Sequence, residues 1–408
     1  MKDCLDNQFE KLTIDYLIKT DISYRKSFGQ YFTPKSIREA LLKKIPFSQK
    51  KIKILDPACG TGEFLLSASK YFKKAKLYGW DIDKKLIEIS KKIVPKAKLE
   101  TVDSLTKEVT EKFDLVIGNP PYFEFQPYNG IKNKYKEVIN GRVNIFNLFI
   151  KLGLDLLKEN GYLAYVVPPS MNNGAYFYKL REYIVKHSNI ESLSILESPK
   201  LFHSAQQTVM LLVLKKTKNR GNYLFKKNGV TIFTENPSLL NKVFKGKKTL
   251  KEMNFTVKTG KLVWNQNKDL LTDDPNEGVL LVWAKNITSD GLVKPLKNKK
   301  QYVKSNNYDI GPAIVVNRIV GSVGNSQLKA SIIPKGEKFL AENHVNVIYP
   351  PNKNGQLNFL SSKKNNNIEL EKIVYQLNSR DKIKLLQCIT GNTQISKNEL
   401  EKLFPLEV

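Results

Sequence analysis

Short apolar runs alternate with helix-like segments between residues 51 and 216, and this alternation constrains the fold more than any other feature of the chain. Strand-like runs stand at 51–56, 76–82, 98–103, 113–119, 162–168, 191–196 and 207–216. Between them, apolar residues three and four apart predict helices at 62–74, 84–93 and 143–161, the last with Gly161 as its stop signal. Repeated strand–helix–strand units favour a mostly parallel sheet covered on both faces. We therefore predict an α/β domain in this part of the chain.

The character of the sequence changes after about residue 220. Gly, Asn, Pro and short β-like runs replace the strand–helix pattern, for example at 223–233, 278–287, 313–321 and 345–351. Basic, Asn-rich loops separate these runs. We predict a first domain over 1–225, a linker near 218–240, and a second, mixed α+β domain over 240–408.

The formal net charge of +28 restricts the partners of the chain. A charge of this size favours a polyanion, either nucleic acid or an anionic membrane surface. The longest apolar run, 162–169, is far too short to span a membrane, so nucleic acid is the favoured partner. The Lys- and Asn-rich composition of an AT-rich genome would produce the same charge, and this alternative stays open.

The three cysteines, Cys4, Cys59 and Cys388, lie far apart, without paired spacing or a neighbouring His. They imply neither a disulfide framework nor a zinc site. The first twelve residues are polar and lack the apolar core of a signal peptide. We expect a reducing, cytoplasmic location, with no metal and no membrane.

A small-residue turn follows the first strand, in the run Ile54–Leu66. Gly60 and Gly62 remove side chains where a ligand would approach the backbone, and such turns sit at the carboxyl ends of parallel strands, where open α/β sheets bind ligands. Asp81 ends the next strand, at the spacing of about 20 residues that places an acid at ribose hydroxyls. Asp103 ends the third strand, where it could accept a hydrogen bond from an adenine amine. The alternative is that these acids cap helices, a role that suits Asp83 better.

The run Asn119-Pro120-Pro121-Tyr122 ends an apolar, strand-like segment. The prolines stiffen the chain and lack an N–H, which leaves carbonyl groups free. The Asn119 side chain and the Pro120 carbonyl offer two acceptors that suit an –NH2 group, and Tyr122 adds a flat face on which a ring could stack. Two acceptors that hold both hydrogens of a heteroaromatic amine would activate it toward a methyl-sulfonium electrophile. A plain turn is the alternative.

With these segments in view, the chain resembles the gamma-class adenine-N6 DNA methyltransferases, which use S-adenosylmethionine. The resemblance is strong over about 15–220 and weaker over 259–268 and 312–321. The segments that carry it are "FTP" (32–34), "DPACGTGEF" (56–64), "WDID" (80–83), "VD" (102–103), "NPPY" (119–122), "GYLAYVVPPS" (161–170) and "LFHSAQQTVMLLVL" (201–214). It implies a Rossmann-like methyltransferase domain with a seven-stranded, mostly parallel sheet, followed by a DNA target-recognition domain at 240–408.

The resemblance also implies a role for individual residues. Thr33 would touch the methionine end of S-adenosylmethionine, Asp81 its ribose and Asp103 its adenine. Asn119, which also borders the cofactor, and the Pro120 carbonyl would hold the target amine. The target base would stack on Tyr122 and, against its other face, Phe202, for which core packing is the alternative. The remaining cofactor cradle would consist of Asp56, Ala58, Gly60 and Gly62.

The target adenine of such an enzyme lies inside double-stranded DNA and has to be swung out of the stack. Lys-rich loops would neutralise phosphates, so that binding weakens with salt. Arg318 is a candidate for reading a base, with a phosphate or structural role as the alternative. A separately encoded restriction endonuclease is a further expected partner.

Several other functions remain compatible with the motifs. A release-factor glutamine methyltransferase also uses Asn-Pro-Pro-Tyr, because a glutamine amide presents a similar –NH2. Cytosine-N4 methyltransferases more often carry Ser in place of Asn. A catalytically silent DNA-binding protein is a rival from a different class. A fused restriction nuclease is disfavoured, because no paired-acid-plus-lysine motif stands out.

Overall fold

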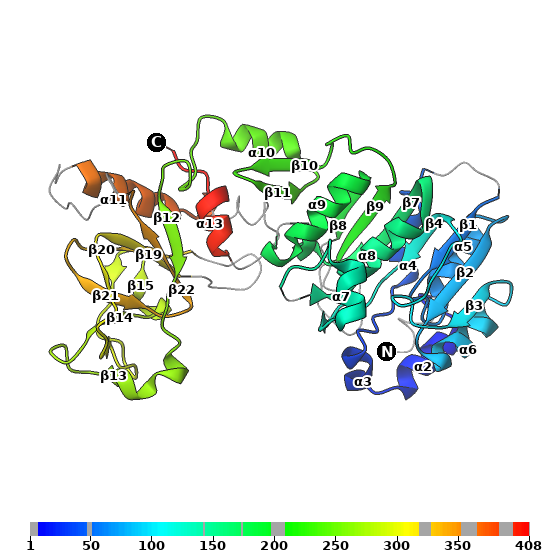
Figure 1. The fold of residues 1–408 in the computed structure, drawn as a ribbon, viewed down its shortest axis with the longest axis horizontal. Coiled ribbons are helices and arrows are strands. Elements are labelled where there is room, and N and C mark those ends of the chain that lie inside the picture. Colours follow the sequence, from blue (N-terminus) through cyan, green and yellow to red (C-terminus); the bar gives the residue numbers. More distant parts are fainter. Residues whose placement is uncertain are drawn as a thin grey trace. The chain divides into compact units, whose positions relative to one another are not determined.

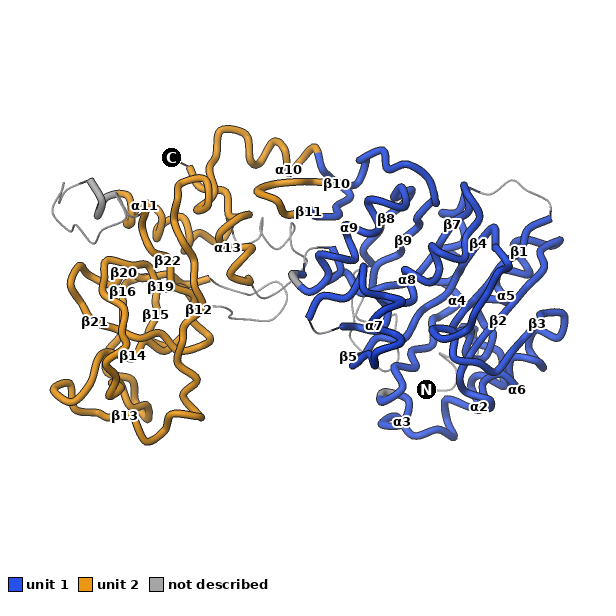
Figure 2. Tube along the Cα trace, in the orientation of Figure 1, with its two compact units in different colours: residues 1–224, 231–237 blue, residues 225–230, 238–408 orange. Residues whose placement is uncertain are grey.

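The computed structural model describes residues 7–46, 51–141, 143–172, 174–196, 209–317, 328–351, 365–382 and 395–407. The chain forms two compact units (Figure 2). The first comprises residues 1–224 and 231–237, and the second comprises residues 225–230 and 238–408. The boundary falls in a hairpin of β10 (Leu224–Lys227) and β11 (Val230–Phe233), so part of the predicted linker is regular structure.

The first unit is built on a seven-stranded sheet in the order β3-β2-β1-β4-β7-β9-β8 (Figure 1). Its strands are β1 (Lys53–Asp56), β2 (Lys76–Asp81), β3 (Lys98–Thr101), β4 (Phe113–Gly118), β7 (Leu157–Val167), β8 (Asn189–Leu196) and β9 (Val209–Lys215). Neighbours from β3 to β7 pair in parallel, whereas β9 is antiparallel to both of its neighbours. This confirms the predicted α/β fold with a seven-stranded, mostly parallel sheet.

Helices cover both faces of this sheet. The helices of this unit are α2 (Lys11–Lys19), α3 (Ile22–Ser27), α4 (Lys35–Leu42), α5 (Glu63–Tyr71), α6 (Lys84–Ile93), α7 (Asn129–Tyr135), α8 (Ile145–Leu156) and α9 (Tyr178–His187). Successive residues of a strand point to opposite faces. In β7, Leu163 and Tyr165 join the core that contains α8 and α9, whereas Ala164 and Val166 join the core that contains α4 and α5. Burial on both faces explains the nearly continuous apolar runs of the sequence.

One predicted helix is longer than the observed one. The apolar spacing over 143–161 predicted a single helix, but β6 (Val143–Asn144), paired with β5 (Glu124–Phe125), precedes α8, and α8 ends at Leu156. Leu157 is already extended and pairs with Phe113 of β4. The helix therefore ends where pairing with the sheet begins, a tertiary contact that leaves no mark in the spacing of apolar residues.

The second unit is mostly antiparallel. Its four-stranded sheet consists of β12 (Thr256–Thr259), β22 (Val345–Tyr349), β19 (Ala313–Asn317) and β20 (Ala330–Ile333). Its five-stranded sheet consists of β13 (Leu271–Thr272), β17 (Tyr302–Val303), β14 (Val279–Val282), β21 (Lys338–Ala341) and β18 (Asp309–Ile310). A small pair, β15 (Ile287–Thr288) and β16 (Gly291–Leu292), accompanies the helices α10 (Pro237–Phe244), α11 (Asn365–Leu377) and α13 (Lys397–Leu403). This agrees with the predicted mixed α+β composition. Among the described residues of both units, no helix has the length and apolar character needed to cross a membrane.

Candidate active site

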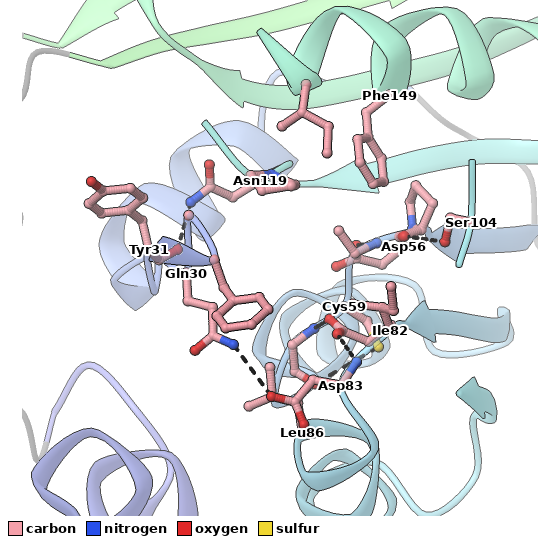
Figure 3. Close-up of a pocket in the computed structure, with 18 of the residues that line it drawn as sticks. Gln30, Tyr31, Asp56, Cys59, Ile82, Asp83, Leu86, Ser104, Asn119 and Phe149 are labelled. Carbon is pink, nitrogen blue, oxygen red and sulfur yellow. Dashed lines mark hydrogen bonds between the residues drawn. The ribbon is translucent and has the colours of Figure 1, made fainter. Parts of the chain in front are cut away.

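The loops that follow β1, β2, β3 and β4 line a cavity of about 590 Å³, together with a segment near the N-terminus and residues of α8 (Figure 3). Widely separated parts of the sequence contribute to it, because the carboxyl ends of parallel strands meet at one edge of the sheet. Among the residues predicted from the sequence, those that line the cavity are Thr33, Asp56, Ala58, Gly60, Asp81, Asp103 and Asn119.

Two glycines shape the turn after β1. Gly62 is the N-cap of α5, its φ is 86°, and a Cβ added there would lie 2.4 Å from Ser90 Oγ. Gly60 has a φ of 56°, and a Cβ at this position would meet no atom within 4 Å. Both backbone conformations are ones that glycine adopts at little cost. The turn is therefore compact against α6 at Gly62 and leaves space for a ligand at Gly60.

Asp81, at the end of β2, and Asp103, just after β3, differ in the hydrogen bonds that their carboxylates accept. Asp81 accepts hydrogen bonds from the backbone N–H groups of Gly60 at 2.8 Å and of Asp83 at 2.9 Å, which joins the two loops. Asp103 Oδ1 accepts from the Leu105 N–H at 2.9 Å, whereas its Oδ2 has no hydrogen-bond partner among the described residues. Asp83 accepts from the Lys85 N–H at 2.8 Å at the start of α6, which confirms its predicted capping role.

Asp56 is the most buried acid of the cavity wall, with 1% of its surface exposed. Its Oδ1 accepts a hydrogen bond from the Ala58 N–H at 3.1 Å. Burial, with a smaller contribution from the negative charge of Asp81, raises the pKa of Asp56 from 3.8 to about 8. This raised pKa favours the protonated form of the Asp56 carboxyl at neutral pH.

We expect this raised pKa to appear in the pH dependence of stability. Between pH 4 and 8 the native state holds a proton on Asp56 that the unfolded chain releases, so the free energy of unfolding falls as the pH rises. Asp56→Asn removes this contribution. Urea denaturation at a series of pH values should show the variant's free energy of unfolding rising relative to that of the wild type, by up to about 1.4 kcal/mol per pH unit between pH 4 and 8. Above pH 8 this difference should stay constant. If the free energies of unfolding of the two proteins changed with pH in parallel, the raised pKa of Asp56 would be contradicted.

Thr33 brings a buried hydroxyl to the cavity wall. Only 4% of the residue is exposed, and its Oγ1 has no hydrogen-bond partner among the described residues. Its carbonyl accepts from Arg38 Nη1 at 2.6 Å, and the same guanidinium forms an ion pair with Glu63 at 2.8 Å. Arg38 and Glu63 are both buried. This pair ties the loop of Thr33 to the first turn of α5.

Asn119 reaches the cavity from the end of β4, and both ends of its side-chain amide are engaged. Nδ2 donates to the Tyr31 carbonyl oxygen at 2.8 Å, and Oδ1 accepts from the Tyr122 hydroxyl (Figure 3 shows Asn119 and Tyr31). That hydroxyl also lies 2.5 Å from the Val166 carbonyl oxygen. The rings of Tyr31 and Tyr122 are nearly parallel, with centroids 6.2 Å apart. Burial raises the pKa of the Tyr122 hydroxyl well above its usual range, so it is a neutral donor.

Some predicted residues stand apart from the cavity wall. Gly62, Pro120 and Tyr122 adjoin residues of the wall in sequence but do not line it. Phe202 and Arg318 lie outside the described residues. The residues that line the cavity without having been predicted as site residues include Gln30, Tyr31, Ile82 and Phe149. Of these, only Ile82 carried a local signal, because it directly follows Asp81; its side chain is apolar yet 66% exposed.

A family model described as N-6 DNA Methylase matches residues 3–306, which is most of the chain. The chain belongs to the N-6 DNA methylase family. This methylase is 26% identical over 343 residues to the type II methyltransferase M.CvrRI of Paramecium bursaria Chlorella virus XZ-6E, covering 83% of this chain and 88% of the viral one. It is 25% identical over 469 aligned positions to the type II methyltransferase M.BsuBI of Bacillus subtilis, covering 97% and 90%.

Among solved structures, the methylase is similar to a Listeria monocytogenes protein assigned to the class I S-adenosylmethionine-dependent methyltransferases. The TM-score is 0.44 at 27% identity, over 51% of this chain and 65% of the other.

Family membership decides the chemistry. The methylase transfers the methyl group of S-adenosylmethionine to the N6 amine of adenine in DNA. The glutamine-methyltransferase, cytosine-N4 and non-catalytic readings of the sequence therefore give way to the adenine-specific one. Within the described residues, no group of His, Cys, Asp and Glu is arranged to hold a metal ion. The glycine turn and the unpartnered Thr33 hydroxyl fit a polar cofactor.

Proposed function

We propose that Asn119 and Pro120 are the catalytic groups of this methylase and that the chain is the modification enzyme of a restriction–modification system. An adenine amine is a poor nucleophile because its lone pair is delocalised into the ring. The Asn119 Oδ1 and the Pro120 carbonyl would accept its two hydrogens, favour a tetrahedral nitrogen and concentrate electron density there. The observation that supports this most is that the Asn119 amide lines the same cavity as Gly60 and Asp81.

S-adenosylmethionine supplies, when bound, the methyl group as a sulfonium electrophile. We assign its methionine end to Thr33, its ribose to Asp81 and its adenine amine to Asp103. The unpartnered Thr33 Oγ1 supports this, because a buried polar atom without a partner is costly and a ligand would remove that cost. The rest of the proposed cradle consists of Asp56, Ala58, Gly60 and Gly62. Close placement of the reacting groups then supplies much of the rate.

Tyr122 is proposed to stack on the flipped adenine, with Phe202 against its other face. The Tyr122 hydroxyl donates to Asn119 Oδ1, which is the acceptor assigned to the target amine. A hydroxyl has a single proton, and the Val166 carbonyl is a second acceptor within reach. The arriving amine would therefore displace the hydroxyl from Oδ1 without leaving it unbonded. Base flipping costs a few kcal/mol, which aromatic stacking helps to offset.

Residues 240–408 are proposed to form the DNA target-recognition domain, with Arg318 as a candidate reader of a base. The charge of +28 supports a partner that carries many phosphates. The relatives M.CvrRI and M.BsuBI are both named type II methyltransferases, which supports a role beside a separately encoded restriction endonuclease. The protein would then act in the cytoplasm, on the DNA of the nucleoid.

Transfer of a tritiated methyl group to double-stranded DNA tests the proposal. Digestion of the product should place the label on N6-methyldeoxyadenosine, and mapping of methylated positions should yield one short sequence. Because phosphate contacts release counterions, DNA binding should weaken steeply as the salt concentration rises. Labelled adenines scattered without a common sequence would contradict the proposed site-specific modification role.

A further inference from the structure

The segment of residues 29–33 contacts both sides of the proposed active site: the loop after β2, next to the cofactor cradle, and the Asn-Pro-Pro-Tyr corner. We propose that the main-chain carbonyl of Tyr31 is the positioning group that sets the orientation of the Asn119 amide. The proposal rests on the catalytic role of Asn119 proposed above. Its geometric basis is the 2.8 Å hydrogen bond from Asn119 Nδ2 to the Tyr31 oxygen, which joins residues 88 positions apart.

The orientation of this amide decides whether it helps or opposes the reaction. With Oδ1 toward the target, the amide accepts a hydrogen from the adenine amine. Rotated by half a turn about its last bond, it would present –NH2 to –NH2, and two donors would face each other. A group that holds Nδ2 elsewhere keeps Oδ1 available for the target.

Of the two partners of Asn119, only the Tyr31 carbonyl discriminates between the orientations. A carbonyl oxygen is an acceptor only, so it bonds to Nδ2 and not to Oδ1. The Tyr122 hydroxyl can donate or accept and would satisfy either end of the amide. The Tyr31 carbonyl is therefore the group that selects the amide orientation with Oδ1 toward the target.

The segment is anchored on the cofactor side of the cavity. Gln30 Oε1 accepts from the Tyr16 hydroxyl at 2.9 Å, and Gln30 Nε2 lies 3.5 Å from Asp83 Oδ2 (Figure 3 shows Gln30 and Asp83). The Thr33 carbonyl accepts from Arg38 at 2.6 Å. Tyr31 stands between these two anchors. The position of its carbonyl thus depends on α2, on α4 and on the loop after β2, which follows directly on Asp81.

At its other end the segment passes directly against the Asn-Pro-Pro-Tyr corner. Gly29 has a φ of 61°, and a Cβ added there would lie 2.8 Å from Phe123 Cδ1 and 3.1 Å from Pro121 Cβ. A side chain at this position would push the segment away from the corner. Gly29→Ala therefore shifts the Tyr31 carbonyl relative to the corner while leaving the Asn119 side chain itself unchanged.

The matched control is Gly221→Ala. Gly221 has a φ of 81°, but a Cβ there would meet no atom within 4 Å, so this variant carries similar backbone strain without displacing a neighbour. At saturating cofactor and DNA, we expect Gly29→Ala to lower the single-turnover rate of methyl transfer at least tenfold, since small displacements of reacting groups are costly. Gly221→Ala should keep the wild-type rate. The dissociation constant of S-adenosylmethionine, measured by calorimetry, should change far less than the rate in Gly29→Ala.

A second variant avoids any steric change. Incorporating the α-hydroxy acid analogue of phenylalanine at position 32 turns the Tyr31–Phe32 amide into an ester, whose carbonyl is a weaker acceptor. We expect a lower single-turnover rate here as well. Wild-type rates in both Gly29→Ala and the ester protein, alongside an inactive Asn119→Ala, would overturn the inference and leave the proposed function standing. A fully active Asn119→Ala would overturn both.

Discussion

Asn119→Ala is expected to lower the single-turnover rate of methyl transfer at least a hundredfold, because removal of one preorganised polar group typically costs about that much. The variant loses Oδ1 as the acceptor assigned to the target amine. It keeps the turn after β1 and the Asp81 carboxylate, which Asn119 does not contact. Rapid-quench measurement with tritiated cofactor and duplex DNA gives the rate.

Cofactor binding is the internal control for this variant. Calorimetric titration with S-adenosylmethionine should give a dissociation constant close to that of the wild type, because the cavity has many other lining groups. A normal rate would refute the catalytic role of the side chain. Loss of both the rate and cofactor affinity would mean that Asn119 holds the site together rather than acting on the target amine.

Arg38→Met is expected to lower the free energy of unfolding by about 3–5 kcal/mol, which is the usual cost of leaving one member of a buried ion pair uncompensated. Glu63 would remain buried, with its side chain 7% exposed, after losing the guanidinium 2.8 Å away. The carbonyl of Thr33 would lose its donor at the same time. We therefore expect weaker binding of S-adenosylmethionine in addition to the lower stability in urea.

Helix α4 offers a matched control for this prediction. Lys35 pairs with Glu39 at 3.9 Å, and both side chains are nearly half exposed. Lys35→Met should cost less than about 1 kcal/mol, as surface ion pairs do. The double variant Arg38→Met/Glu63→Leu should recover part of the lost stability, because no charge is left buried without a partner. If Arg38→Met lowered the free energy of unfolding as little as Lys35→Met does, the stabilising role of the buried ion pair would be contradicted.

Most residues proposed for the cradle were found from the sequence because they end or closely follow a strand, whereas Thr33, just before α4, was assigned only through the family resemblance. The turn at Gly60, the acid at Asp81 and the corner at Asn119 each end an apolar run. In a parallel sheet such ends converge on one edge, so their meeting in one cavity follows from topology. The end of α8 at Leu156 was not predictable in this way, because the apolar spacing continues through Leu157, the first residue of β7.

The sequence by itself determined the mostly parallel sheet and the residue types at the strand ends, since these follow from local periodicity and short motifs, and its resemblance to a known family implied the cofactor. Only the tertiary structure decided which groups hold them in place. The Tyr31 carbonyl bonds to Asn119, and Arg38 pairs with Glu63, although each partner is remote in the chain. A backbone carbonyl is common to every residue, and a buried ion pair depends on the packing of two helices. Neither therefore leaves a pattern in the order of the amino acids.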